Sequence, residues 1–482
     1  MSAATEQPAQ RGETVTLRIE KFADQGKGLA RHDSGLVIFV PQAVPGDRVR
    51  AKVTRRQKNF AEAKLTQLLN ASEKRAEPRC FYFGTCGGCD WQHVQYAEQV
   101  RMKQQSVREA LVHRGGFDED MVRGAMRSII EAERPYLYRN TMRFDFSDAR
   151  WLTRDEIDSG EDFDTGFALG LHAPGQPRKV LDLKECHLQS RPSRRLVNRV
   201  RSFVKERGWA PQDPHRDPSR GDGFLRRLVI RQSERTGSVL VALVTGRRDE
   251  ERMDALAAFL QREFPDVTTF VHLVNGASSS AQHVHFGDGR FRERLGGFTF
   301  AVGPETFFQP NTQQAERLFE AARELADLAP TVRCYDLYCG AGALSLVAAE
   351  AAGEVVGIEG REASVEEARA NAAAHDVANA RFFSGAVEER FTEAFAEKHG
   401  RPDVLLADPP RAGMDERVPE RIAALRPERV VYVSCDPQTQ ARDLKRLREA
   451  TGGGAYRLAA VQPVDQFPQT AHVENVVALR EA

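Results

Sequence analysis

Long hydrophobic runs are absent from this chain of 482 residues. No segment approaches the roughly 18 apolar residues that a membrane-spanning helix needs, and the longest candidate, residues 239–244, has the length of a strand. The N-terminal sequence MSAATEQPAQRGET has no apolar segment of the kind found in secretory signals. We therefore expect a cytoplasmic protein, a monomer, with no membrane partner.

Cysteine is scarce, and the seven cysteines present are an odd number. In a cytoplasmic chain this excludes a disulfide framework and leaves metal binding or catalysis as roles to test. Three cysteines form a compact group, Cys80-x5-Cys86-x2-Cys89, and Cys186 is a candidate fourth ligand. Four thiolates suit zinc and an iron–sulfur cluster equally, so the spacing leaves both open.

A net charge is also absent, because 69 Lys and Arg balance 69 Asp and Glu. The distribution is uneven: residues 1–79 carry 15 basic and 9 acidic side chains, a net of +6, and the remainder carries −6. A basic N-terminal segment suggests a polyanionic partner, although a merely solvated face is equally compatible with the charge. The composition, 41% hydrophobic and 29% charged, excludes a collagenous or largely disordered chain.

The sequence predicts a disordered tail over 1–11 and a small β-barrel over 12–72. Alternation in this segment places Arg48, Arg50 and Lys52 on one face of a strand, and small barrels with basic faces commonly bind nucleic acid. A central domain over 73–300 holds the cysteine group, a helix over 94–114 and a hairpin of 228–231 with 239–245. Six acids within 155–164 indicate a solvated loop.

From residue 311 helices and strands alternate, which predicts a doubly wound α/β domain over 301–482 with a mainly parallel sheet. The expected fold class is therefore α/β and multidomain, with a β-barrel, a central α+β domain and a Rossmann-like domain. The expected helices and strands of the last domain are 311–328, 332–336, 343–352, 355–359, 362–374, 403–407, 430–434 and 439–449.

A glycine-containing loop, Asp336-Leu-Tyr-Cys-Gly340-Ala-Gly342, follows the first of these strands. Glycines allow a tight turn and close approach to a ligand. Glu359 ends the next expected strand, where a carboxylate binds the ribose hydroxyls of an adenosine group. The third glycine of a dinucleotide fingerprint is missing, so S-adenosylmethionine fits better than NAD.

Three further candidates lie at the expected ends of strands. Asp408-Pro-Pro-Arg411 follows one strand, and Cys435 follows the next, directly before a helix. A thiolate is stabilised at such a helix N-terminus, although a lone cysteine is as often a buried apolar residue. Glu474 leads into a C-terminal strand and is either a general base or a solvent-facing residue.

These motifs together resemble the RNA uridine C5-methyltransferases. That family has Asp336-Leu-Tyr-Cys-Gly, Asp408-Pro-Pro-Arg, Ser434-Cys435-x-Pro and Phe467-Pro-x-Thr-x-His-Val-Glu474 in this order. The N-terminal barrel resembles the family's TRAM domain, and the cysteine group matches its iron–sulfur members. The chain is most similar to the subgroup that modifies 23S rRNA.

The resemblance implies roles for individual residues. Cys435 is the nucleophile that adds to uracil C6, and Glu474 is the base that removes the C5 proton. Asp408 contacts the cofactor and the target base, and the other implied contacts of S-adenosylmethionine are Gln309, Tyr338, Gly340, Gly342 and Glu359. Asp436, Ala343 and Ala386 depart from the family's usual residues.

The same resemblance favours a [4Fe–4S] cluster on Cys80, Cys86, Cys89 and Cys186. The expected function is methylation of uridine C5 in RNA, most simply in 23S rRNA. The same reaction on tRNA is the close alternative. A non-catalytic iron–sulfur RNA-binding protein is the distant one, and it would be expected to lack Cys435 or Glu474.

Overall fold

The computed structural model describes residues 9–23, 26–212, 223–275 and 280–482. Residue contacts divide the chain into two compact units. The first comprises residues 1–103 and 467–472, and the second comprises 104–466 and 473–482. Most of the tail predicted for residues 1–11 lies outside the described residues, and the predicted boundaries at 72 and 300 remain predictions.

The first unit contains a six-stranded sheet in the order β1-β5-β6-β4-β3-β2. Its strands are β1 (Thr14–Arg18), β2 (Lys21–Phe22), β3 (Gly28–Arg31), β4 (Val37–Val40), β5 (Arg48–Arg56) and β6 (Phe60–Asn70). Along β5, Val49, Ala51 and Val53 are buried while the residues between them are exposed. This alternation is the one that the sequence predicts for a half-buried strand.

The unit boundary at residue 103 falls within a helix that the sequence predicts over 94–114. It is formed by α1 (Tyr96–Glu109) and one π-helical turn, η2 (Ala110–Arg114), and α2 (Glu119–Ala125) follows. Asp118 begins α2 as its N-cap, since its carboxylate accepts a hydrogen bond from the Met121 N–H at 3.0 Å.

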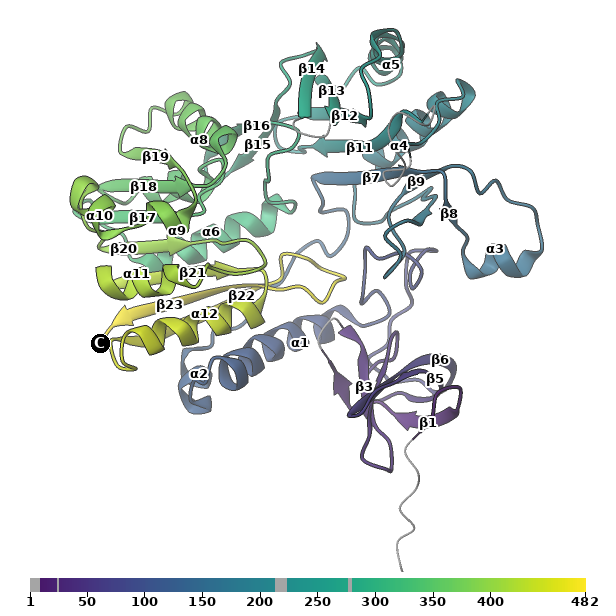
Figure 1. Ribbon diagram of the computed structural model, residues 1–482, viewed down its shortest axis with the longest axis horizontal. Helices are drawn as coiled ribbons and strands as arrows, with labels where there is room; N and C mark the ends of the chain where they lie inside the picture. The colour runs from purple at the N-terminus through teal and green to yellow at the C-terminus, as the bar shows by residue number, and fades with distance from the viewer. Residues whose placement is uncertain (1–8, 24–25, 213–222, 276–279) are drawn as a thin grey trace, which may run out of the picture. The chain divides into compact units, whose positions relative to one another are not determined.

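The second unit begins with a six-stranded sheet in the order β14-β13-β12-β11-β7-β9 (Figure 1). Its strands are β7 (Thr141–Ser147), β9 (Ala168–Gly170), β11 (Leu225–Gln232), β12 (Val239–Thr245), β13 (Thr269–Asn275) and β14 (Ser280–Phe286). Strands β11 and β12 form the predicted antiparallel hairpin. Helices α4 (Arg191–Glu206) and α5 (Glu250–Glu263) pack apolar side chains against those of the sheet, and together they form one hydrophobic core.

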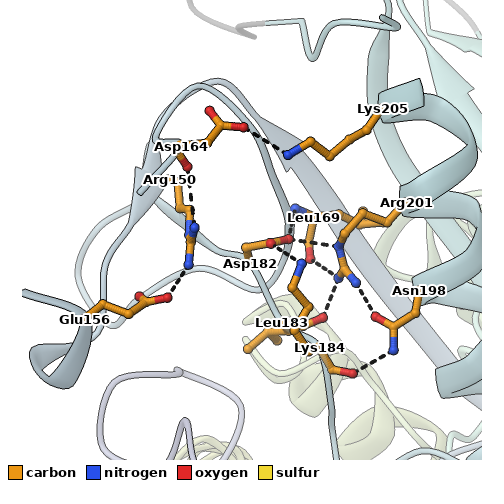
Figure 2. Close-up of polar contacts among 10 residues, drawn as sticks. All are labelled: Arg150, Glu156, Asp164, Leu169, Asp182, Leu183, Lys184, Asn198, Arg201 and Lys205. Atoms are coloured by element: carbon orange, nitrogen blue, oxygen red, sulfur yellow. Dashed lines mark hydrogen bonds and ion pairs between the residues drawn. The ribbon is translucent and has the colours of Figure 1, made fainter. Parts of the chain in front are cut away.

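The sequence analysis interpreted the acidic segment 155–164 as a solvated loop, and this was wrong for half of it, which is helical. Helix α3 (Arg154–Ser159) starts at a capping box: the Glu156 N–H donates to Thr153 Oγ1 at 3.3 Å, and the Thr153 N–H donates to the Glu156 carboxylate at 2.8 Å. Its acids are also paired, Glu156 with Arg150 and Asp164 with Lys205 (Figure 2). The Thr-x-x-Glu signal was present in the sequence.

A buried ion pair lies beside this segment (Figure 2). Arg201 of α4 meets Asp182 at 2.9 Å and donates to the carbonyls of Leu169 and Leu183. Asn198 on the same helix donates to the Lys184 carbonyl at 2.8 Å. These contacts fix the chain just before Cys186. The short strands nearby are β8 (Arg150–Trp151) and β10 (Val180–Leu181).

The C-terminal part of the second unit is a seven-stranded sheet in the order β19-β18-β17-β20-β21-β23-β22 (Figure 1). Its strands are β17 (Arg333–Leu337), β18 (Glu354–Glu359), β19 (Ala380–Ser384), β20 (Val404–Ala407), β21 (Arg429–Ser434), β22 (Tyr456–Val464) and β23 (Glu474–Glu481). The first five are parallel, and β23 runs antiparallel to both of its neighbours. This is the predicted doubly wound α/β fold.

The helices of this part agree with the expected ones to within three residues at either end. They are α6 (Thr312–Ala326), α7 (Ala343–Ala349), α8 (Glu362–Ala374) and α12 (Pro437–Ala450). The sequence analysis missed strands β19 and β22 and the helices α9 (Val387–Arg390), α10 (Glu393–His399) and α11 (Arg417–Leu425). A two-stranded ribbon of β15 (Phe291–Leu295) and β16 (Phe298–Val302) precedes α6.

Candidate active site

Most of the predicted site residues follow strands of the seven-stranded sheet. Tyr338, Gly340 and Gly342 come directly after β17, Glu359 ends β18, Asp408 follows β20 and Cys435 follows β21. Parallel strands end at the same edge, and the chain crosses from one side to the other between β17 and β20. That edge and that switch point are where doubly wound folds bind ligands.

The register of the sheet brings Glu474 to Cys435. Strands β21 and β23 are antiparallel, and Ser434 pairs with Asn475. The next residue on one strand and the preceding residue on the other are Cys435 and Glu474, so they come opposite each other. Parallel pairing of Ala407 with Tyr432 places Asp408 at the same edge.

The two carboxyl groups at this edge, those of Glu474 and Asp408, both have a raised pKa. Glu474 is 3% exposed, and its Oε2 has no hydrogen-bond partner among the described residues. Burial raises the pKa of Glu474 well above its ordinary value, and the charge of Asp408 raises it further. Burial also raises the pKa of Asp408 to about 7. The pair therefore retains a proton near neutral pH.

The sequence left Cys435 either as a thiolate stabilised by a helix N-terminus or as a buried cysteine, and its surroundings disfavour the charged form. Burial, followed by the charges of Glu474 and Asp408, raises the pKa of Cys435 to about 12. Loss of water and two nearby carboxylates outweigh the favourable helix N-terminus. Cys435 is consequently a thiol at neutral pH, and an attack by its sulfur requires a proton acceptor.

Asp436, which departs from the family's usual residue, has a structural role. Its carboxylate is the N-cap of α12 and accepts from the Gln438 N–H at 2.9 Å and the Thr439 N–H at 3.3 Å. Its second oxygen lies 3.5 Å from Nε of Arg411. The negative charge beside the thiol is thus partly balanced by a cation and by a helix N-terminus.

The glycine loop is held against the predicted ribose-binding acid. The Gly340 N–H donates to one oxygen of Glu359 at 3.2 Å, and the Arg361 N–H donates to the other at 2.8 Å. Tyr338, Gly340 and Gly342 all have positive φ, of 65°, 55° and 84°. A Cβ at Gly342 would lie only 3.1 Å from that of Ala368, so this turn needs glycine.

Gln309 is buried in the second unit. Its side-chain oxygen accepts from Nε2 of Gln466 at 3.0 Å, and its carbonyl accepts from the Asn140 amide at 2.9 Å. The sequence analysis missed Gln466 because only the fold brings the two amides together. It also placed Asp336 in the loop motif without giving this residue a role, and burial raises the pKa of Asp336 to about 7. An acid within an apolar strand was the available signal.

The four predicted cluster ligands lie in different parts of the chain. Cys80, Cys86 and Cys89 belong to the first unit and are partly buried, and the Gly88 N–H donates to Sγ of Cys86 at 3.4 Å. Cys186 belongs to the second unit, where burial raises the pKa of its thiol. Cys334 and Cys339 are buried in the core of the second unit.

A basic surface runs along β5 of the first unit. The exposed residues Arg48, Arg50 and Lys52 pair with Arg18, Thr16 and Thr14 on β1. On the other side, Lys52 pairs with Lys64 of β6, and Arg50 donates to the Gln67 amide oxygen at 3.3 Å. Within the part of the chain that the structure describes, no acid pairs with these three residues, so the face is positively charged.

No helix within the described part of the chain is long and apolar enough to cross a membrane.

The doubly wound sheet and the residues at its edge define a methyltransferase fold, and comparison with known proteins agrees. Residues 232–482, just over half of the chain, match the model of the tRNA (uracil-5-)-methyltransferase family, and residues 8–66 match the TRAM domain. The chain belongs to this RNA methyltransferase family, as the resemblance predicted.

The curated relatives span nearly the whole chain. A protein described as an uncharacterized RNA methyltransferase from Bacteroides thetaiotaomicron is 38% identical over 95% of this chain and 99% of its own length. A second such protein, from Porphyromonas gingivalis, is 38% identical over 96% and 99%. The solved structure of Pyrococcus abyssi tRNA (uracil-54, C5)-methyltransferase with S-adenosyl-L-homocysteine superimposes with a TM-score of 0.71 and 27% identity, covering 96% of this chain and 99% of that one.

Proposed function

We propose that this chain methylates C5 of a specific uridine in RNA through a covalent bond between Cys435 and uracil C6. The observation that carries the proposal is the register of β21 and β23, which sets a thiol opposite a buried carboxyl group at the edge of a methyltransferase sheet. A nucleophile and a base in contact with one substrate ring are what this chemistry requires.

The residues at the ends of β17 and β18 fit S-adenosylmethionine. The glycine turn exposes backbone at the switch point, and Glu359 presents a carboxylate where ribose hydroxyls bind in this fold. The Pyrococcus abyssi relative was solved with S-adenosyl-L-homocysteine. Gln309, Tyr338, Gly340, Gly342, Glu359 and Asp408 would hold the cofactor, which supplies an electrophilic methyl group.

Cys435 begins the reaction, because uracil C5 alone is a weak nucleophile. Its sulfur adds to C6, and the electrons of the C5–C6 double bond move toward C5, which becomes nucleophilic enough to accept the methyl group. Glu474 then removes the C5 proton. The electrons of the broken C5–H bond reform the double bond, and the thiolate leaves C6.

The proton of Cys435 has to leave before the addition. Asp408 is the acceptor at this edge, since its carboxyl group acts on the thiol and Glu474 is kept for the later step. Transfer of a proton from sulfur to the ionised Asp408 carboxylate removes a negative charge that disfavours the thiolate. Because the pair holds a proton at neutral pH, Glu474 gives that proton to solvent after the addition, and its carboxylate then accepts the proton from C5.

The TRAM domain and the basic face of β5 support RNA as the substrate, with the exposed cations binding phosphates. The resemblance favours 23S rRNA as the target. The same reaction on tRNA is the second candidate, because the structural relative from Pyrococcus abyssi is a tRNA enzyme.

We further propose that Cys80, Cys86, Cys89 and Cys186 hold a [4Fe–4S] cluster. Thiolates are the donors that such a cluster requires, and the N–H of Gly88 directed at Cys86 Sγ is the kind of contact that stabilises cluster sulfurs. The cluster would tie the cysteine loop together, and no step of the methylation uses it.

Mass-spectrometric mapping of 5-methyluridine tests the target. In a strain lacking this gene, one site in 23S rRNA should lose the modification, and the wild-type gene but not Cys435→Ala should restore it. Loss confined to tRNA would replace the proposed target with the alternative. Unchanged 5-methyluridine in both RNAs would overturn the proposed function.

A further inference from the structure

A cluster of side chains that can bind a metal ion lies in the second unit, beside the six-stranded sheet whose edge strand is β14. Glu250 and Asp254 occupy positions one turn apart on α5, so they share a face of the helix. His285 belongs to β14, the strand at the edge of that sheet. Each of the three offers a ligand atom, and these atoms all lie within 4.8 Å of one another.

The imidazole of His285 is built into this cluster and is not a loose surface group. Its side chain is 7% exposed, and Nδ1 lies 3.3 Å from the Asp254 carboxylate. Its other nitrogen, Nε2, is buried and has no hydrogen-bond partner among the described residues. A buried imidazole that has one nitrogen against a carboxylate and a second nitrogen without a partner has the chemistry of a metal ligand.

Two more histidines surround His285. His283 is two residues earlier on β14 and pairs with His272 of β13. The ring of His272 lies 6.1 Å from that of His285 and 6.0 Å from that of His283. His272 is fully buried and its Nε2 is 2.7 Å from Thr245 Oγ1.

One cation already faces the cluster. The guanidinium of Arg248 pairs with Glu250, while the nearby Asp249 carboxylate caps α5 and contacts Arg252 instead. The position of Arg248 shows that the carboxylates attract positive charge. A metal ion bound between Glu250 and His285 would take the place of this guanidinium.

We propose that Glu250, Asp254 and His285 form a binding site for a divalent transition-metal ion such as Zn²⁺, with His283 available as a further ligand. Imidazole together with carboxylates favours zinc-like ions over Mg²⁺ and Ca²⁺, which take oxygen ligands. The bound ion would link the first turns of α5 to an edge strand, and so protect a strand that has no further neighbour in its sheet. This site is separate from the methylation chemistry.

Isothermal titration of the full-length protein with Zn²⁺ tests the proposal. Asp254 is 74% exposed on its side chain, so Asp254→Asn leaves the fold intact. It should remove one binding event, or weaken it by more than the roughly 10- to 100-fold that loss of a group outside the ligand shell costs. Any zinc bound by the cysteines is the same in both proteins and cancels in the comparison.

Two further variants separate ligation from a structural effect. Arg248→Ala should tighten Zn²⁺ binding by about two- to five-fold, because it removes a competing exposed ion pair. His172→Gln is the matched control, since His172 also contacts an aspartate, Asp145, at 3.1 Å, and it should leave binding unchanged.

Zinc should also raise the melting temperature of the wild-type protein and not that of Asp254→Asn. Equal zinc uptake by wild type and Asp254→Asn would overturn the proposal. So would an equal loss in His172→Gln, or weaker binding in Arg248→Ala.

Discussion

At the scale of single residues, burial disfavours negative charge throughout the candidate active site. Cys435, Asp408 and Glu474 all have a raised pKa, and burial is the main cause for each of them. A reactive thiolate therefore forms only when a proton is transferred within the site.

The effect of the Asp408 charge on the pKa of Cys435 leads to a prediction about the rate at which Cys435 reacts with iodoacetamide. Asp408→Asn removes a negative charge that raises the pKa of Cys435, so at pH 8 to 9 the variant should be alkylated faster. The gain should be about tenfold for each unit by which the pKa falls, because the thiolate fraction rises in that proportion. Mass spectrometry of the Cys435 peptide over time measures the rate.

Asp415→Asn is the control for this experiment. Asp415 is a partly buried acid in the segment after Arg411, paired with Arg417, and it is not among the groups that act on Cys435. The control should react at the wild-type rate. An Asp408→Asn variant that does the same would show that Asp408 does not govern the thiol.

At the scale of elements, the strands and helices with strong local patterns were predictable from the sequence. The hairpin of β11 and β12 and the alternation along β5 follow from apolar periodicity and turn residues, and α8 was placed at its observed bounds. The strands β19 and β22 were missed. Strand β19 is five residues long and partly exposed, and β22 alternates only over residues 456–460 before an unbroken buried stretch.

The geometry of the candidate site depended on topology, which local patterns do not encode. Cys435 and Glu474 are 39 positions apart in the sequence, and they meet because β23 inserts antiparallel between β21 and β22. The motifs identified the residues. The raised pKa of Cys435 and the contact between Gln309 and Gln466 could only come from the folded arrangement.

The basic face of β5 leads to a prediction about RNA affinity. Arg50→Ala with Lys52→Ala should weaken RNA binding and reduce the steepness of its salt dependence, by about 0.7 to 0.9 for each phosphate that the variant no longer neutralises. Filter binding at several salt concentrations gives the slope. Arg31→Ala is the control, because Arg31 is an exposed arginine at the end of β3 and pairs with Glu20. It should leave the slope unchanged. An unchanged slope in the double variant would mean that the face is only solvated.

At the scale of the whole molecule, the first unit is built from two separate segments of the chain. Residues 467–472, from the C-terminal motif, belong to this unit together with residues 1–103. The Gln469 carbonyl accepts from the N–H groups of Asp90 and Trp91 at 2.9 and 3.0 Å, next to Cys89. Lys103 donates to the Phe467 carbonyl at 2.9 Å. Residues 90, 91 and 103 thus hold the loop of the C-terminal motif within the first unit.

The cysteine ligands lead to a prediction about metal content. Protein purified anaerobically should be brown and contain roughly four irons per chain, as a four-thiolate cluster requires. Cys86→Ser should lose the colour and most of the iron, whereas Cys334→Ser, at a buried core cysteine, should keep both. Elemental analysis that finds stoichiometric zinc without iron would contradict the cluster.

The central claim is that Cys435 and Glu474 act at opposite ends of one covalent reaction, and a trapping experiment tests it most directly. Wild type, Cys435→Ala and Glu474→Gln are incubated with substrate RNA, with and without S-adenosylmethionine, and run on a denaturing gel. Glu474→Gln should form the adduct and transfer the methyl group, and then stall because the C5 proton cannot leave. A slow-migrating protein–RNA band should accumulate that depends on the cofactor, while Cys435→Ala shows neither band nor turnover. A band with Cys435→Ala, or wild-type turnover by Glu474→Gln, would contradict the account.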